Sequence, residues 1–127
     1  MCNGTVLVID DDHAVRHSLS LLLREEGFNV ETYDSGADCL ENCDFREVIC
    51  AIVDYHMPDM TGVELARMLR AGWLDIPVIL LSAMMPEHAE EAARAAGIQA
   101  ILRKPPDITH LCSLIHAARN RLDLSRL

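Results

Sequence analysis

Polar and charged side chains directly follow four short apolar runs of this chain. Because the carboxyl ends of parallel strands meet at one edge of a sheet, we expect these side chains to share one rim. That rim would hold an acidic cluster, one hydroxyl group and one ammonium group. The residues concerned are Asp10, Asp11, Asp12, Asp54, Ser82 and Lys104.

The acidic part of this rim requires a cation. Two carboxylates about 4 Å apart repel each other by roughly 4 kcal/mol at an effective dielectric constant near 20, so a cluster of them needs a positive partner or raised pKa values. A hard divalent ion, Mg²⁺ or Mn²⁺, takes oxygen ligands and keeps positions open for phosphate oxygens. A lysine then acts as a point charge for phosphate, and a hydroxyl adds a hydrogen bond. Together these groups predict phosphoryl transfer, with one carboxylate as the nucleophile.

Each of these residues also has an ordinary structural explanation when it is taken alone. An Asp after a strand is most often a turn former or a helix cap, and we assign Asp12 to that role. A Lys before Pro is usually an exposed loop residue, and a Ser after a strand is usually a cap. The joint occurrence at four strand ends favours the chemical interpretation.

The elements that must position the rim alternate along the chain. Short apolar runs alternate with longer amphipathic segments, which is typical of an α/β fold with a parallel sheet. The predicted strands are 6–9, 30–33, 48–53, 78–81 and 100–102, and the predicted helices cover 15–23, a segment after Ser35, 61–69, 86–96 and 108–118.

Local signals mark where these helices begin and end. Ser35, Thr61 with Glu64, and Asp107 have the types and spacings of N-terminal caps. Gly27 and Gly97 stand where the first and fourth helices should stop. Segment 86–96 is rich in Ala and Glu and short of large apolar side chains, so we expect it to pack comparatively weakly.

Composition excludes several classes of protein. The 127 residues fit one compact domain. Eleven basic and 20 acidic residues give a net charge of −9, which argues against direct contact with nucleic acid or with acidic lipid surfaces. We expect a cytoplasmic location, since no apolar run is long enough to span a membrane and no signal peptide is recognisable. Five irregularly spaced cysteines indicate no disulfide framework, and a metal site at Cys39 and Cys43 is improbable.

Four motifs carry a resemblance to a known family. They are VLVIDDD at 6–12, DYHMPDMTG at 54–62, LSA at 81–83 and KP at 104–105. In order and spacing they resemble the receiver domain of two-component response regulators. The resemblance covers residues 1–122 and leaves 123–127 as a tail or the start of a linker. It implies a flavodoxin-like three-layer αβα sandwich whose five-stranded parallel sheet has the order 2-1-3-4-5.

The same resemblance implies a metal site. Asp11 would bind Mg²⁺ directly, and Asp10 would act through a water molecule. Asp54 and the backbone carbonyl of His56 would complete the site. The ring of His56 is an improbable ligand, because Mg²⁺ prefers oxygen.

Roles in phosphorylation follow from the resemblance as well. Asp54 would accept a phosphoryl group, Lys104 would pair with that group, and Ser82 would reorient to donate a hydrogen bond to it. The family pattern has a small residue next to this serine, and Ala83 matches it. The Lys104–Pro105 bond is a candidate for the cis form.

Several positions depart from the family pattern or tune it. Ile101 stands where family members often carry an aromatic side chain that swings inward on activation, so an aromatic switch is excluded. Pro106 stands where an aromatic residue commonly follows. His56 and Met84 occupy positions that tune hydrolysis of the phosphoryl group, and we hypothesise that Met84 shields the acyl phosphate from water. We expect His13 and His17 to lie on an exposed helix face.

The resemblance implies a phosphorylation switch rather than an enzyme. Its chemistry would be limited to self-catalysed phosphotransfer and autodephosphorylation. Its phosphodonor would be a sensor histidine kinase or a histidine phosphotransfer protein. The 86–118 face would signal to an effector domain or output protein, and a homodimer is a further option. Two alternatives are a degenerate receiver that only docks partners and a Mg²⁺-dependent phosphatase with an aspartyl nucleophile. The phosphatase usually needs a second Asp two residues after the first, where His56 stands.

Overall fold

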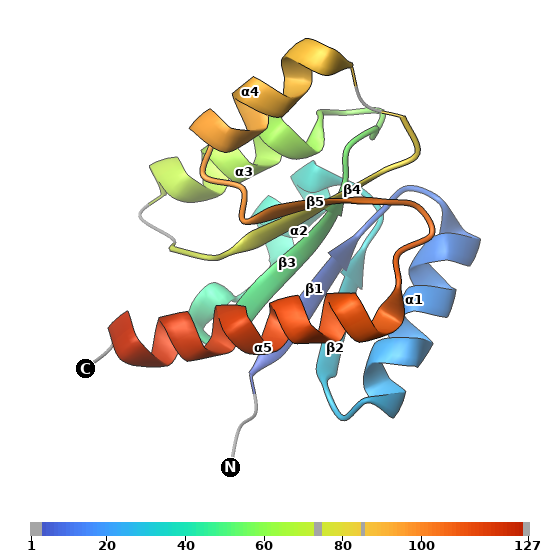
Figure 1. The fold of residues 1–127 in the computed structure, drawn as a ribbon, viewed down its shortest axis with the longest axis vertical. Coiled ribbons are helices and arrows are strands. Elements are labelled where there is room, and N and C mark those ends of the chain that lie inside the picture. The colour runs from blue at the N-terminus through green and yellow to red at the C-terminus, as the bar shows by residue number, and fades with distance from the viewer. Residues whose placement is uncertain (1–3, 73–74, 85, 126–127) are drawn as a thin grey trace.

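A five-stranded parallel sheet lies between two layers of helices in the computed structural model, which describes residues 4–72, 75–84 and 86–125 (Figure 1). The order of the strands is β2-β1-β3-β4-β5. The predicted α/β sandwich and its strand order are therefore confirmed. The strands are β1 (Thr5–Ile9), β2 (Asn29–Tyr33), β3 (Val48–Asp54), β4 (Val78–Ser82) and β5 (Ala100–Arg103).

The predicted helices are present, and a short 3₁₀ helix, η1, precedes β3. The helices are α1 (His13–Glu25), α2 (Gly36–Asn42), η1 (Phe45–Glu47), α3 (Gly62–Ala71), α4 (Glu87–Ala95) and α5 (Ile108–Ser125). Helix α5 includes residues 123–125, which we expected to form a tail or linker, whereas residues 126–127 and Cys2 lie outside the described residues. Among the described helices, none is long and apolar enough to cross a membrane.

Most helix ends follow the predicted capping chemistry. The Asp12 carboxylate accepts hydrogen bonds from the first turn of α1, which confirms its assignment as a cap. Thr61 and Glu64 form a capping box at the start of α3, and Asp107 accepts hydrogen bonds from the first turn of α5. Gly97 follows α4 with φ +81°, a left-handed conformation that favours glycine.

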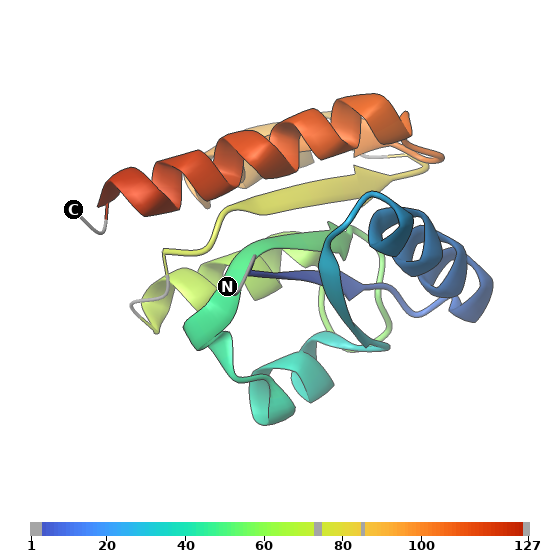
Figure 2. The same cartoon turned by 90° about the horizontal axis from the view of Figure 1, so that it is seen from below.

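Each face of the sheet has its own hydrophobic core. Strand β3 is buried at all seven positions, as expected for a strand covered on both faces. Alternate side chains of β1 point to opposite faces: Val6 and Val8 pack with α1 and α5, and Leu7 and Ile9 pack with α2, α3 and α4. Figure 2 shows α5 lying along one face of the sheet.

Helix α4 is held by small side chains. Of its described side chains, Ala89 and Ala93 are buried, and Pro86 provides no side-chain cap at its N-terminus. Burying a methyl group removes far less apolar surface from water than burying a Leu or Ile side chain. Displacing α4 therefore exposes little apolar surface, in line with the comparatively weak packing that its sequence predicts.

Two leucines on α1 test this description of the core. Leu23 is 0% exposed and Leu21 is 46% exposed. We predict that Leu23→Ala lowers the free energy of unfolding by about 2–5 kcal/mol, because burial is lost and a cavity remains. Leu21→Ala should change the free energy of unfolding by about 0.5 kcal/mol or less. Urea denaturation measures both, and equal losses would contradict the assignment of Leu23 to the core.

Candidate functional site

The carboxyl ends of the strands bring the predicted residues together. The register pairs Ile9 with Val53, Asp54 with Leu81 and Ser82 with Arg103, so β1, β3, β4 and β5 end at similar heights. Asp10 and Lys104 each follow directly on a strand end. Parallel topology therefore places carboxylate, hydroxyl and ammonium groups on one rim, as predicted.

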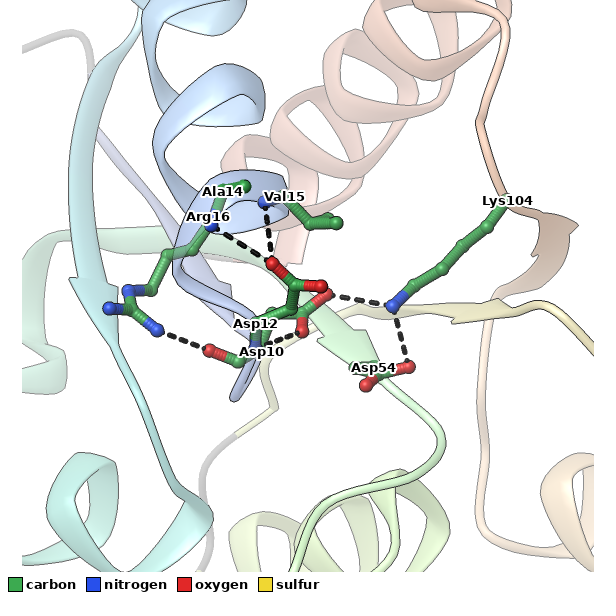
Figure 3. A network of polar contacts seen from close by, with 7 residues as sticks. All are labelled: Asp10, Asp12, Ala14, Val15, Arg16, Asp54 and Lys104. Carbon is green, nitrogen blue, oxygen red and sulfur yellow. Dashed lines mark hydrogen bonds and ion pairs between the residues drawn. The ribbon is translucent and has the colours of Figure 1, made fainter.

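Lys104 bridges two buried carboxylates at the centre of the rim (Figure 3). Its Nζ lies 2.9 Å from Asp10 Oδ2 and 3.0 Å from Asp54 Oδ1. Asp10 is 2% exposed and Asp54 is 6% exposed. Such charges are costly to bury unless they are paired. One ammonium group shared by two carboxylates leaves the centre with an excess of negative charge.

The pKa values reflect this crowding. Burial raises the pKa of Asp54, the hydrogen bond from Lys104 lowers it, and the charge of Asp10 raises it, with a net upward shift. Burial lowers the pKa of Lys104, but its hydrogen bonds with Asp10 and Asp54 outweigh burial and raise the pKa above its ordinary value. Lys104 is therefore held in its charged form between the carboxylates.

Three carboxylates form a set of oxygen donors suited to a hard cation. One oxygen from each of Asp10, Asp11 and Asp54 lies within 4.8 Å of the other two. Asp11 is exposed, whereas the other two are buried. The oxygen donors and the excess negative charge fit Mg²⁺, which prefers oxygen ligands and keeps several water molecules.

Ser82 brings an unsatisfied hydroxyl to the rim. The residue is 4% exposed, and among the described residues its Oγ has no hydrogen-bond partner. Leaving a buried polar group unpaired costs about 1–3 kcal/mol. An anionic oxygen brought within reach would provide the missing acceptor. A cavity of about 240 Å³ adjoins this residue and is lined by Ser82, Ala83, Met84, Glu90, Ile101, Leu102 and Arg103.

His56 connects two loops at the edge of the site. Its Nε2 lies 3.3 Å from the backbone oxygen of Met84, and its backbone N–H donates a hydrogen bond to the Asp54 carboxylate. The ring therefore faces a carbonyl group of the β4–α4 loop. The side chain of Met84 is 81% exposed.

Two contacts on the rim were not anticipated from the sequence. Arg16 Nη1 donates a 2.7 Å hydrogen bond to the backbone oxygen of Asp10, and Asp10 Oδ1 accepts one from the N–H of Asp12. The acidic turn is therefore held from α1 as well as from β5. A basic residue one turn into the helix after an acidic strand end is the signal that would have suggested the Arg16 contact.

The other residues singled out from the sequence lie away from the centre of the site. His13 and His17 are exposed, with ring centroids 5.9 Å apart. Burial raises the pKa of the Cys39 thiol to about 12, so it is not poised as a metal ligand. In the described part of the chain, the acidic cluster is the sole potential metal-binding group found, and it does not include Cys39 or Cys43. The Lys104–Pro105 bond is cis, as predicted.

Known proteins share this architecture and its motifs. A family model for the "Response regulator receiver domain" matches residues 6–116. The cell cycle transcriptional regulator CtrA of Caulobacter vibrioides is 30% identical over 116 residues, which are 91% of this chain and 50% of that protein. The cell cycle response regulator CtrA of Brucella ovis is 32% identical over the same shares. The chain therefore spans about half the length of these relatives.

A solved structure agrees with the sequence matches. A response regulator receiver domain protein from Clostridium thermocellum is 28% identical and superposes with a TM-score of 0.86. The superposition covers 95% of this chain and 98% of that one. Sequence and fold therefore point to the same family.

Replacing Lys104 tests its place between the carboxylates. We predict that Lys104→Gln lowers the free energy of unfolding in metal-free buffer by about 1–3 kcal/mol, because Asp10 and Asp54 lose their shared cation. Arg103→Gln removes an exposed positive charge from the neighbouring position and serves as the control. Urea denaturation measures both variants. A loss no greater than that of the control would show that the ammonium group does not hold the carboxylates together.

Proposed function

Because this chain belongs to the response regulator receiver domain family, whose model matches residues 6–116, we propose that it accepts a phosphoryl group on Asp54. The observation that carries this proposal is the convergence of Asp10, Asp11, Asp54 and Lys104 at one point of the rim. Asp54 is the member of this cluster that ends the central strand β3. Its carboxylate is the nucleophile we assign.

The transfer needs one carboxylate and an activated phosphoryl donor. A carboxylate oxygen of Asp54 forms a bond to phosphorus while the P–N bond of a phosphohistidine breaks. The bonding electrons pass to the imidazole nitrogen, which takes up a proton from solvent. The donor we propose is a sensor histidine kinase or a histidine phosphotransfer protein. Hydrolysis of the acyl phosphate returns the carboxylate, and we assign the chain no other catalytic activity.

Receiver domains bind Mg²⁺ at an acidic pocket, and the residues here suit that ion. We assign Asp11, Asp54 and the backbone carbonyl of His56 as direct ligands, with Asp10 acting through water. When bound, the ion neutralises negative charge on the phosphoryl oxygens. Lys104 would supply a second positive charge, because its Nζ already contacts Asp54.

Phosphorylation would change the balance at the rim. The new group carries about −1.5 to −2 charge at neutral pH, by analogy with other phosphoryl groups. Its oxygens offer Ser82 the acceptor it lacks and give Lys104 a stronger anion than Asp10. The resulting shift of the β4–α4 loop would change the 86–118 face, formed by α4, β5 and α5.

The length of the relatives bears on which domain or protein would receive the signal from this chain. Because this chain spans half the length of the CtrA proteins it matches, we assign its output to an effector domain or a separate output protein that contacts the 86–118 face. A homodimer through that face is a second candidate. The phosphatase alternative lacks its second Asp, since the ring of His56 stands there and faces the carbonyl of Met84.

Labelling with a small phosphodonor tests the assignment of Asp54. We expect incubation with Mg²⁺ and acetyl phosphate to add the mass of one phosphoryl group, and Asp54→Asn to abolish this gain. Asp12→Asn is the matched control, because Asn also caps a helix and Asp12 lies outside the acidic centre. Intact-protein mass spectrometry gives the readout. Absence of labelling in the parent protein would favour a docking-only receiver.

The lifetime of the acyl phosphate tests the role of Met84. We predict that Met84→Ala accelerates dephosphorylation, because a bulky side chain beside Ser82 would restrict the access of water. Met68→Ala removes another exposed methionine, on α3, and should leave the rate unchanged. The decay of phosphorylated protein after removal of the donor measures both variants. An unchanged rate in Met84→Ala would contradict shielding.

A further inference from the structure

The loop between β3 and α3, residues 55–61, is fastened to the start of α2 by a long-range contact. Asp59 Oδ2 accepts a 2.8 Å hydrogen bond from the backbone N–H of Ala37, which lies 22 residues earlier. That N–H belongs to the first turn of α2, where N–H groups have no partner within the helix. Asp59 therefore does for α2 what a local cap does, but from a different part of the chain.

Packing strengthens the same attachment. A Cβ atom on the buried Gly36 would lie 2.5 Å from Sδ of Met60. The thioether of Met60 thus sits directly against the backbone of the first turn of α2. Two consecutive residues of the loop, Asp59 and Met60, hold it to α2 by a hydrogen bond and by close packing.

The N-terminal end of this loop, at Tyr55 and His56, forms part of the proposed phosphorylation site. The N–H of Tyr55 donates to the carbonyl of Leu81 at 2.8 Å, and the Tyr55 carbonyl accepts from Gly62 N–H at 3.0 Å. Between these bonds and Asp59 lies His56, whose N–H donates a hydrogen bond to Asp54. The path of the backbone at His56 is therefore determined from both sides, by the sheet and by α2.

We propose that Asp59 is a positioning residue for the phosphorylation site. By fastening the loop to α2, it keeps the backbone of His56 in place, with the N–H on Asp54 and the carbonyl available to the cation. The inference rests on the proposed function, because it assigns the His56 carbonyl as a ligand. Asp59 itself contacts neither the cation nor the phosphoryl group in this scheme.

The expected effect of removing the contact is on binding and transfer. In Asp59→Ala, we expect the affinity for Mg²⁺ to fall by roughly three- to tenfold, the range that the loss of one hydrogen bond predicts. The rate of phosphorylation by acetyl phosphate at a fixed Mg²⁺ concentration should fall with it. Titration calorimetry with MgCl₂ and the labelling time course provide the two measurements.

Two further variants separate positioning from other effects. Ser35→Ala removes the local cap of α2, where Ser35 Oγ accepts from the N–H of Asp38 at 3.1 Å, and leaves the loop untouched. It should lower the melting temperature without changing the affinity for Mg²⁺. Asp59→Asn keeps an acceptor for Ala37 and removes the charge, so it should bind Mg²⁺ like the parent protein.

Each outcome decides the inference. A parent-like affinity in Asp59→Ala overturns it, because the contact then has no effect on the site. If Ser35→Ala lost as much affinity for Mg²⁺ as Asp59→Ala, the effect would come from the stability of α2. If Asp59→Asn lost as much, the effect would come from the charge of Asp59. A parent protein that binds Mg²⁺ and labels at Asp54 preserves the proposed function in all three cases. A parent protein that does neither overturns both proposals.

Discussion

One ammonium group shared by two buried carboxylates is the interaction on which the site depends. Asp10 directly follows β1, Asp54 ends the neighbouring strand β3, and both lose most of their hydration in the fold. Without Lys104 between them, two poorly hydrated carboxylates would repel each other with no positive charge to offset the repulsion. The ammonium group arrives from the far edge of the sheet, after β5. The charged centre therefore exists only when β1, β3 and β5 are all in place.

The sheet meets this demand because its closely packed central part fixes the positions of the strand ends. Strand β3 is buried throughout, and each face of the sheet is covered by its own core. Interiors of this kind are close-packed and resist displacement. The chemistry lies at the strand ends and in the loops that follow them, where Arg16 of α1 and the loop residues Asp59 and His56 add hydrogen bonds. Precision at the rim thus comes from the sheet and from a few contacts between loops.

The sequence predicts the features that depend on local or periodic patterns. Strands appear as apolar runs, caps appear as Ser35, Thr61 and Asp107, and parallel topology then brings Asp10, Asp54 and Lys104 together. The contacts of Asp59 with Ala37 and of His56 with Met84 could not be predicted. They join residues 22 and 28 positions apart, whose proximity follows from tertiary packing and leaves no periodic signal in the sequence.

The asymmetry between the helices indicates which way a change at the rim would travel. Helices α1 and α5 bury large side chains such as Leu23, Leu111 and Ile115, whereas α4 buries alanines. Displacing a large buried side chain costs more than displacing a methyl group, because more apolar surface and more packing contacts are lost. Ser82, whose hydroxyl lacks a partner, precedes the loop that leads into α4. A new anion on Asp54 would therefore act through Ser82, whose hydroxyl gains an acceptor, on a helix whose described buried side chains are alanines.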